Sequence, residues 1–329
     1  MAKRTATSAT APSGRLGPYS IAVLVPCYNE EVAVARVVKD FRAALPNAAI
    51  FVFDNNSTDN TAAAARDAGA EVFHEKRQGK GFVVSRMFTD VEADIYVLVD
   101  GDATYDAPSA PEMIARLLDE RLDMVVGNRV DREVDAYRAG HRTGNWLLTS
   151  FVASVFGPSF KDMLSGYRVF SRRFVKSFPV LSGGFEIETE LTIHALELGL
   201  PVAEIDTPYY ARPKGSASKL NTWRDGFRIL RTIVGIYRAE RPLPFFTGIG
   251  LALAIASIGF AIPVFMTYFE TGLVPRLPTA VLSLGLMLMA FLSGAIGLVL
   301  DTVTRGRREV KLLAYLSHRA PGEERRLRS

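Results

Sequence analysis

Residues 93–102 read Ala-Asp-Ile-Tyr-Val-Leu-Val-Asp-Gly-Asp, an apolar run that ends in two aspartates separated by one glycine. A short apolar run of this kind predicts a buried β-strand, and the Asp-Gly-Asp that follows it predicts a turn. Carboxylate oxygens suit hard divalent cations such as Mg²⁺ and Mn²⁺. We therefore predict that Asp100 and Asp102 bind Mg²⁺ or Mn²⁺, and that a cation held there binds a diphosphate.

Strands and helices alternate around this run. Further short apolar runs predict strands at residues 21–26, 49–53, 71–74 and 124–126. Apolar periodicity and helix-start signals predict helices at residues 30–45, 61–68, 81–90 and 111–120. This alternation predicts an α/β fold in which helices cover both faces of a parallel sheet. Because ligands of such sheets bind at the carboxyl ends of the strands, Tyr28, Asp54 and the 100–102 turn are expected to converge.

The composition limits the function classes. The chain has 329 residues, of which 48% are hydrophobic, enough for a packed core and about two domains. Its net charge is only +4, and no zinc finger, helix-turn-helix or arginine-rich tract is present, so we predict no nucleic-acid partner. Cys27 is the single cysteine, which excludes an intrachain disulfide and predicts a small filler at a strand end. Residues 1–18 lack the apolar stretch of a secretion signal and predict a disordered tail.

The last third contains two long segments without charged residues, at 247–269 and 279–300. Each is long enough to cross a bilayer, which needs ~20 apolar residues, and the alternative is a pair of buried core helices. The loop at 270–278 contains Arg276 as its only basic residue. The outer flanks are richer in basic residues: Arg228, Arg231, Arg238, Arg241, Arg305, Arg307, Arg308 and Lys311. The positive-inside rule therefore predicts a multi-pass protein of the cell membrane, with the strand-rich domain in the cytoplasm.

Residues 222–241 combine apolar side chains at helical spacing with several arginines. This pattern predicts an amphipathic helix in the lipid headgroup region, and the alternative is a plain surface helix. The predicted domains are a tail (1–18), a strand-rich domain (19–221), an interfacial helix (222–241), two transmembrane helices (242–303) and a basic cytoplasmic tail (304–329). Self-association through the spans stays open, since Gly294 and Gly297 are too few to specify helix packing.

Polar motifs close the predicted strands: Pro26–Glu30, Asp54–Asp59, Asp100–Asp102 and Gly127–Arg129. In this order and spacing they resemble family-two glycosyltransferases with the A-type nucleotide-sugar fold, a Rossmann-like α/β domain. Asp162–Arg168 resembles the acceptor-side motif of that family. Gly184–Glu188 and Arg212–Lys219 are similar to segments of its polyprenyl-phosphate branch, which includes dolichol-phosphate mannosyltransferases and bacterial polyprenyl-phosphate glucosyltransferases. The resemblance covers about Ile21–Leu300.

The resemblance implies a nucleotide-sugar donor site. Its residues would be Pro26, Tyr28, Glu30, Asp54, Lys80, Asp100, Gly101, Asp102, Glu186 and Glu188. Asp54 would accept a hydrogen bond from the base, unless it caps a helix or turn, and Lys80 would reach the base or a phosphate, unless it is a solvated lysine. Asp102 would bind the metal directly, whereas Asp100 would contact the ribose or reach the metal through water. The family often has two successive acids where this chain has Asp54-Asn55.

The same resemblance implies a lipid-phosphate acceptor held by cations and hydroxyls. The candidates are Arg129, Arg142, Arg212, Ser216, Ser218 and Lys219. Arginine presents a planar fork that suits phosphate oxygens. A phosphate monoester has a second pKa near ~6, so the acceptor is largely dianionic and depends less on a general base. Asp162 is the base that the family suggests, and the alternative is a structural ion pair with Arg168. Asp102, Asp162 and Arg129 are thus the predicted catalytic residues.

These expectations combine into one function. We predict an inverting, metal-dependent transferase that moves a single hexose from a nucleotide diphosphate sugar, with UDP-sugars favoured, to a polyprenyl phosphate at the bilayer. The alternatives are a GDP-mannose-dependent dolichol-phosphate mannosyltransferase, a processive polysaccharide synthase and a non-catalytic membrane scaffold. A processive synthase normally carries a Gln-x-x-Arg-Trp motif and more membrane helices, and neither is visible here. A nicotinamide-dependent oxidoreductase would need a Gly-x-Gly-x-x-Gly turn, which is absent.

Overall fold

The computed structural model describes residues 19–131, 160–179, 187–213, 231 and 234–321. The chain divides into two compact units. The first unit comprises Met1–Asp225 and Lys311–Ser329, and the second comprises Gly226–Val310. The predicted tail at 1–18 and most of the predicted interfacial helix lie outside the described residues, although residues 234–240 are helical.

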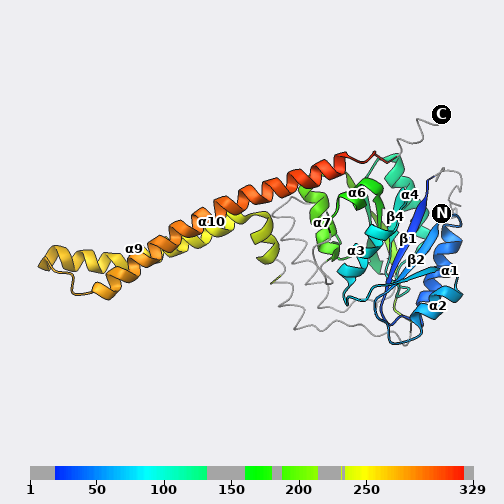
Figure 1. Ribbon diagram of the computed structural model, residues 1–329, viewed down its shortest axis with the longest axis horizontal. Coiled ribbons are helices and arrows are strands. Elements are labelled where there is room, and N and C mark those ends of the chain that lie inside the picture. Colours follow the sequence, from blue (N-terminus) through cyan, green and yellow to red (C-terminus); the bar gives the residue numbers. More distant parts are fainter. Residues whose placement is uncertain (1–18, 132–159, 180–186, 214–230, 232–233, 322–329) are drawn as a thin grey trace, which may run out of the picture. The chain divides into compact units, whose positions relative to one another are not determined.

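A seven-stranded sheet forms the centre of the first unit (Figure 1). Its strands are β1 (Ile21–Cys27), β2 (Ala49–Asp54), β3 (Glu71–His74), β4 (Ile95–Leu98), β5 (Met124–Asp131), β6 (Arg168–Ser171) and β7 (Val202–Tyr209). Their order is β3-β2-β1-β4-β6-β5-β7. The first four strands are parallel, as the sequence predicted.

The prediction of an entirely parallel sheet is wrong at β6, which runs antiparallel to both β4 and β5. All four residues of β6 are buried. The alternation of apolar and polar residues that marks a half-exposed antiparallel strand is therefore missing from this segment. β6 separates β4 from β5, so the strand that ends in the acidic turn does not neighbour the strand that carries Arg129.

Helices cover both faces of the sheet (Figure 1). The helices on one face are α1 (Val34–Ala44), α2 (Thr61–Asp67) and α4 (Ala110–Asp119), which follows the short helix η1 (Ala107–Ser109). Those on the other face are α3 (Lys80–Asp90), α6 (Arg172–Ser177) and α7 (Ile187–Leu198). Because successive side chains of a strand point to opposite faces, Val23 and Val25 of β1 belong to the first core, and Ala22 and Leu24 belong to the second. Burial on both sides explains why the central strands β1 and β4 are apolar throughout.

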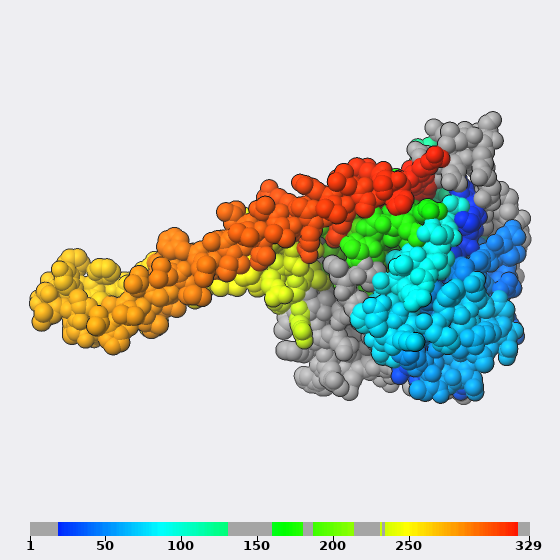
Figure 2. All heavy atoms as spheres, in the orientation of Figure 1, coloured from blue at the N-terminus to red at the C-terminus, as the bar shows by residue number. Residues whose placement is uncertain are grey.

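The second unit contains α9 (Pro242–Thr271) and most of α10 (Leu277–Leu316). Their most apolar 18-residue windows have mean hydropathies of 2.3 and 2.2, and only 11% and 17% of those windows are buried. Both helices are thus long and apolar enough to cross a membrane, and they include the predicted spans at 247–269 and 279–300. The two helices are the yellow-to-red atoms in Figure 2, and many of their large hydrophobic side chains are exposed. α10 also continues as a helix through residues 301–316, part of which we predicted as a tail.

Small residues let α9 and α10 pack closely against each other. A Cβ on Gly250 would lie 2.9 Å from the carbonyl oxygen of Ala290. The Ser293 hydroxyl donates to the carbonyl of Phe246 at 2.8 Å, and the Ser257 hydroxyl donates to that of Ser283 at 2.6 Å. The two helices therefore form a hairpin in which serine hydroxyls of each helix bond to backbone carbonyls of the other.

Candidate active site

Acidic side chains gather where β1, β2 and β4 end. Cys27, the last residue of β1, pairs in register with Asp54, the last residue of β2. Burial raises the pKa of the Cys27 thiol, and nearby carboxylates raise it further: Glu30, Asp54, Asp100 and Asp102. The structure thus brings together the acids that we predicted at these strand ends, around a cysteine that is a buried filler.

The Asp100-Gly101-Asp102 turn fits tightly over the end of β1. A Cβ on Gly101 would collide with the Cys27 sulfur, and a Cβ on Gly166 would collide with the Asp100 carboxylate. Both glycines are therefore needed for close approach, whatever their backbone angles. Only the first belongs to the motif that we singled out as acidic, and Gly166 reaches Asp100 from the loop before β6.

Asp102 is buried and already engaged by other side chains. The Thr104 hydroxyl donates to Asp102 Oδ1 at 2.6 Å, and Arg212 Nη2 donates to Asp102 Oδ2 at 2.7 Å. Burial raises the pKa of the Asp102 carboxyl, as does the neighbouring Asp100, whereas Arg212 and Thr104 act in the opposite direction. Arg212, which we predicted to bind lipid phosphate, therefore lies at the candidate metal ligand. Thr104 was not predicted, although an aspartate often bonds the backbone amide two residues further on, as Asp102 Oδ1 does with the Thr104 amide at 3.3 Å.

Lys80 links Asp100 to Glu188. Its ammonium donates to Asp100 Oδ1 at 2.5 Å and also to Glu188 Oε1. Burial by itself lowers the pKa of Lys80, but the two carboxylates outweigh it and leave this pKa raised. The alternative of a solvated lysine is therefore wrong, since only 11% of the side chain is exposed. Glu188, on α7, is thereby linked to Asp100 through Lys80.

Asn55 holds the loop that leads to Lys80. Its Nδ2 donates to the carbonyls of Glu75 and Arg77 at 3.1 and 2.7 Å, and its Oδ1 accepts from the Gly79 amide at 2.7 Å. A carboxylate at this position accepts hydrogen bonds only and cannot donate to two carbonyls. Gly79 has φ 140°, a conformation that side chains rarely adopt. These contacts give a physical reason for Asn55 where the family often has a second acid.

Asp54 presents one carboxylate oxygen without a partner among the described residues. Its Oδ2 lies 3.1 Å from His74 Nδ1, and His74 Nε2 lies 3.1 Å from Arg66 Nη2. Since a guanidinium only donates, His74 Nε2 must accept and Nδ1 carries the proton that faces Asp54. Oδ1 of Asp54 is buried and makes no hydrogen bond with any residue that the structure describes. Asp54 does not cap α2, whose N-cap residue is Asn60, so the capping alternative is not supported.

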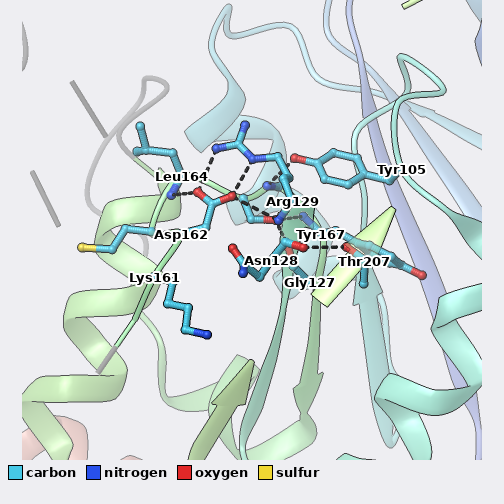
Figure 3. Close-up of polar contacts among 12 residues, drawn as sticks. Tyr105, Gly127, Asn128, Arg129, Lys161, Asp162, Leu164, Tyr167 and Thr207 are labelled. Carbon is cyan, nitrogen blue, oxygen red and sulfur yellow. Dashed lines mark hydrogen bonds and ion pairs between the residues drawn. The ribbon is translucent and has the colours of Figure 1, made fainter. Parts of the chain in front are cut away.

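Asp162 forms a two-pronged ion pair with Arg129 (Figure 3). Arg129 Nε and Nη2 donate to its two oxygens at 2.6 and 2.8 Å. The alternative pairing with Arg168 is wrong, because that guanidinium is fully buried elsewhere. It donates to the carbonyls of Ser165 and Met163 at 2.9 and 2.6 Å, and to the Thr192 hydroxyl at 2.9 Å. Burial lowers the pKa of Arg168 to about 10, so this side chain stays charged near neutral pH.

Of the remaining predicted residues, three lie within the described part of the chain and the others lie outside it. Glu30 is buried, and its amide donates to the Thr61 hydroxyl at 2.8 Å, while Pro26 and Tyr28 are half-buried. Tyr105 was not predicted, and its hydroxyl accepts from the Gly166 amide at 2.9 Å, which fixes the loop facing Asp100. The other predicted site residues lie outside the described residues: Arg142, Glu186, Ser216, Ser218 and Lys219.

The acidic turn fits a divalent cation that is shared with a substrate. Asp100 and Asp102 supply hard oxygen donors, and each already neutralises a cationic side chain. Among the described residues, no group of three or more His, Cys, Asp or Glu side chains is placed to hold a metal. Mg²⁺ commonly binds through one or two carboxylates together with substrate phosphates and water. The donor set therefore suits a cation that arrives with a diphosphate.

The chain is similar in sequence to known glycosyltransferases. The profile of Glycosyl transferase family 2 matches residues 22–178. Glycosyltransferase AglJ of Haloferax volcanii is 35% identical over 247 residues, which cover 74% of this chain and 81% of that protein. A dolichyl-phosphate hexose transferase of the same organism is 27% identical over 221 residues, covering 67% of this chain and 95% of that protein.

The fold also matches a solved structure. Glucosyl-3-phosphoglycerate synthase from Mycobacterium tuberculosis, in complex with Mn²⁺, UDP-glucose and phosphoglyceric acid, is similar with a TM-score of 0.54 and 22% identity. The match covers 68% of this chain and 80% of that one, and it confirms the A-type fold. With its polar motifs at the strand ends and these relatives, the chain belongs to glycosyltransferase family 2 and resembles the polyprenyl-phosphate sugar transferase branch.

Proposed function

We propose that this glycosyltransferase transfers a single hexose from a nucleotide diphosphate sugar, with UDP-sugars favoured, to a polyprenyl phosphate, with inversion at the sugar carbon. The observation that carries this proposal is the acidic turn of half-buried Asp100 and buried Asp102, in a chain that also has two helices able to cross a membrane. The name of the dolichyl-phosphate hexose transferase supports the acceptor. The Mn²⁺ and UDP-glucose of the solved neighbour support the metal and the donor.

Donor binding would use the acidic strand ends. Asp102 would hold Mg²⁺ or Mn²⁺ directly, with Asp100 beside it, and the bound cation would neutralise charge on the departing diphosphate. The buried Oδ1 of Asp54 would accept a hydrogen bond from the base. Lys80 would keep Asp100 and Glu188 in place around the donor through its two ion pairs.

Acceptor binding would use Arg129, together with Arg212 and the predicted residues after it. Because both oxygens of Asp162 are bound by Arg129, this carboxylate is a poor proton acceptor, and we assign it to orienting the guanidinium. The acceptor phosphate is largely dianionic at neutral pH, so its oxygen attacks without needing a strong base. Transfer would take place at the cytoplasmic face of the cell membrane, with α9 and α10 as spans and residues 222–241 in the headgroup region.

Full-length protein in lipid nanodiscs tests the proposal. It is incubated with undecaprenyl phosphate, Mg²⁺ or Mn²⁺, and a panel of UDP- and GDP-sugars, and lipid products are identified by mass spectrometry. We expect one lipid-linked hexose per acceptor, and loss of the reaction when EDTA removes the metal. Asp102→Asn should lower the rate by about 100-fold or more, since it weakens the stabilisation of the leaving diphosphate.

The exposed Asp67 provides a matched control, and Asp67→Asn should keep wild-type activity. Full activity of Asp102→Asn would remove the metal from the proposal. Absence of a lipid product with every donor would contradict the acceptor assignment and favour the non-catalytic scaffold. Product with GDP-mannose alone would support the mannosyltransferase alternative, and chains longer than one sugar would support a processive synthase.

A further inference from the structure

Arg212 binds the aspartate that is the candidate metal ligand. Its Nη2 lies 2.7 Å from Asp102 Oδ2, and the exposed fractions of the two side chains are 34% and 6%. The other oxygen of Asp102 accepts from the Thr104 hydroxyl at 2.6 Å. Both oxygens of this buried carboxylate are therefore engaged. Oδ1 is held by Thr104 of its own turn, and Oδ2 is held by the cationic Arg212.

A divalent cation on Asp102 would compete with this ion pair. Mg²⁺ binds carboxylate oxygens at about 2.0–2.1 Å, so a metal on Oδ2 and a guanidinium on the same oxygen would be like charges only a few ångströms apart. Because the Asp102 carboxylate is only 6% exposed, water screens this repulsion less than it would at a fully exposed site. Lys80 is different, because Glu188 continues to neutralise it when Asp100 turns to another partner.

We propose that Arg212 is an exchangeable counter-cation of the metal site. It neutralises Asp102 while the site holds no metal, and it leaves Asp102 when a divalent cation binds. The released guanidinium is then available to a phosphate group, so the acceptor phosphate gains this partner only after the metal has bound. This inference rests on the proposed function, since it takes Asp102 as the metal ligand.

Direct measurement of Mn²⁺ binding tests the exchange without turnover. Full-length protein in detergent is titrated with Mn²⁺, and the free ion is read from its electron paramagnetic resonance signal. Arg212→Gln removes the competing charge and should tighten Mn²⁺ binding by about fivefold or more, which corresponds to the loss of one partly buried ion pair. Arg212→Lys keeps a positive charge and should remain closer to the wild type.

Arg129→Gln is the matched control, because it removes another guanidinium of the site that pairs with Asp162 instead. It should change the Kd for Mn²⁺ by less than about twofold. The exchange is overturned if Arg212→Gln binds Mn²⁺ as tightly as the wild type or more weakly, or if neither the wild type nor Arg212→Gln binds Mn²⁺. An equal tightening in Arg129→Gln also overturns it, since the effect would then come from net charge.

A second measurement tests the release of the guanidinium. Mn²⁺ should strengthen binding of farnesyl phosphate to the wild type, and Arg212→Gln should lose this coupling. A coupling that survives in Arg212→Gln overturns the release step. Asp102→Asn separates this inference from the proposed function. If Asp102→Asn binds Mn²⁺ as the wild type does, the assignment of Asp102 as the metal ligand is contradicted. If Asp102→Asn loses Mn²⁺ binding and Arg212→Gln binds Mn²⁺ as the wild type does, only the exchange is contradicted.

Discussion

Gly101 separates the two aspartates of the acidic turn because the turn crosses the end of β1, where the Cys27 sulfur leaves no room for a side chain. Gly166 has the same role on the opposite side of Asp100. Both contacts join segments that are distant in sequence. The geometry of the candidate metal ligands therefore depends on the absence of a side chain at both Gly101 and Gly166.

Gly101→Ala should destabilise the protein by about 1–3 kcal/mol, the usual cost of overfilling a packed site. Cys27→Ala removes the sulfur that the new methyl group would meet, so the double variant should recover much of this loss. The free energies of unfolding of the wild type, the two single variants and the double variant are compared by urea unfolding of the full chain. Strict additivity of the two single changes would show that the Cys27 contact is not the cause.

The helical hairpin illustrates the next scale, that of secondary-structure elements. α9 has apolar residues on all sides, and the apolar stretches of α9 and α10 are largely exposed within the second unit. Hydrophobicity therefore does not specify which faces of the helices meet. Small residues specify the contact instead. Gly250 lets the two backbones approach closely, and the hydroxyls of Ser257 and Ser293 bond across the contact.

Gly250→Val should separate the two helices, because a side chain there meets the backbone of Ala290. Gly259→Val is the control, since a Cβ on this glycine of the same helix has no atom within 4 Å. Both changes have the same intrinsic effect on helix propensity, so their difference reports packing. We expect Gly250→Val to lower the thermal stability of the protein in detergent, and Gly259→Val to change it little. Equal losses would contradict the packing explanation.

At the scale of the whole molecule, the chain joins a family-two glycosyltransferase unit to two helices able to cross a membrane. A polyprenyl phosphate keeps its long tail in the bilayer, so an enzyme that uses it must work at the membrane surface. By the positive-inside rule, the distribution of basic residues predicts that both flanks of the hairpin lie on the cytoplasmic side. Arg276, in the turn between α9 and α10, would then face outside.

Cysteine labelling in intact cells tests this orientation. Cys27 is the single native cysteine and is buried, and Cys27→Ala removes it as a background site. Arg276→Cys and Ser317→Cys each place one thiol at an exposed position. A membrane-impermeant maleimide should label position 276 in intact cells and position 317 only after permeabilisation. The reverse pattern would contradict the cytoplasmic placement of the glycosyltransferase unit.

The sequence by itself determined those features that depend on neighbouring residues. Apolar runs placed β1, β2 and β4 close to their observed bounds, because a strand buried on both faces needs apolar residues throughout. Helical periodicity located α1, and uninterrupted apolar length located α9 and α10. The position of Asp100 and Asp102 at a strand end also followed from local pattern. The family resemblance rested on these motifs in order, and the relatives confirm it.

Tertiary structure alone decided which charged groups meet. Lys80 pairs with Glu188 across 108 residues, Arg212 pairs with Asp102, and Asp162 takes Arg129 where we had weighed Arg168. The antiparallel direction of β6 was equally hidden, since its buried residues carry no alternation. The physical reason is that a charge can pair with any opposite charge that the fold brings near. Sheet order and loop packing choose the partner, and neither is encoded in the residues beside it.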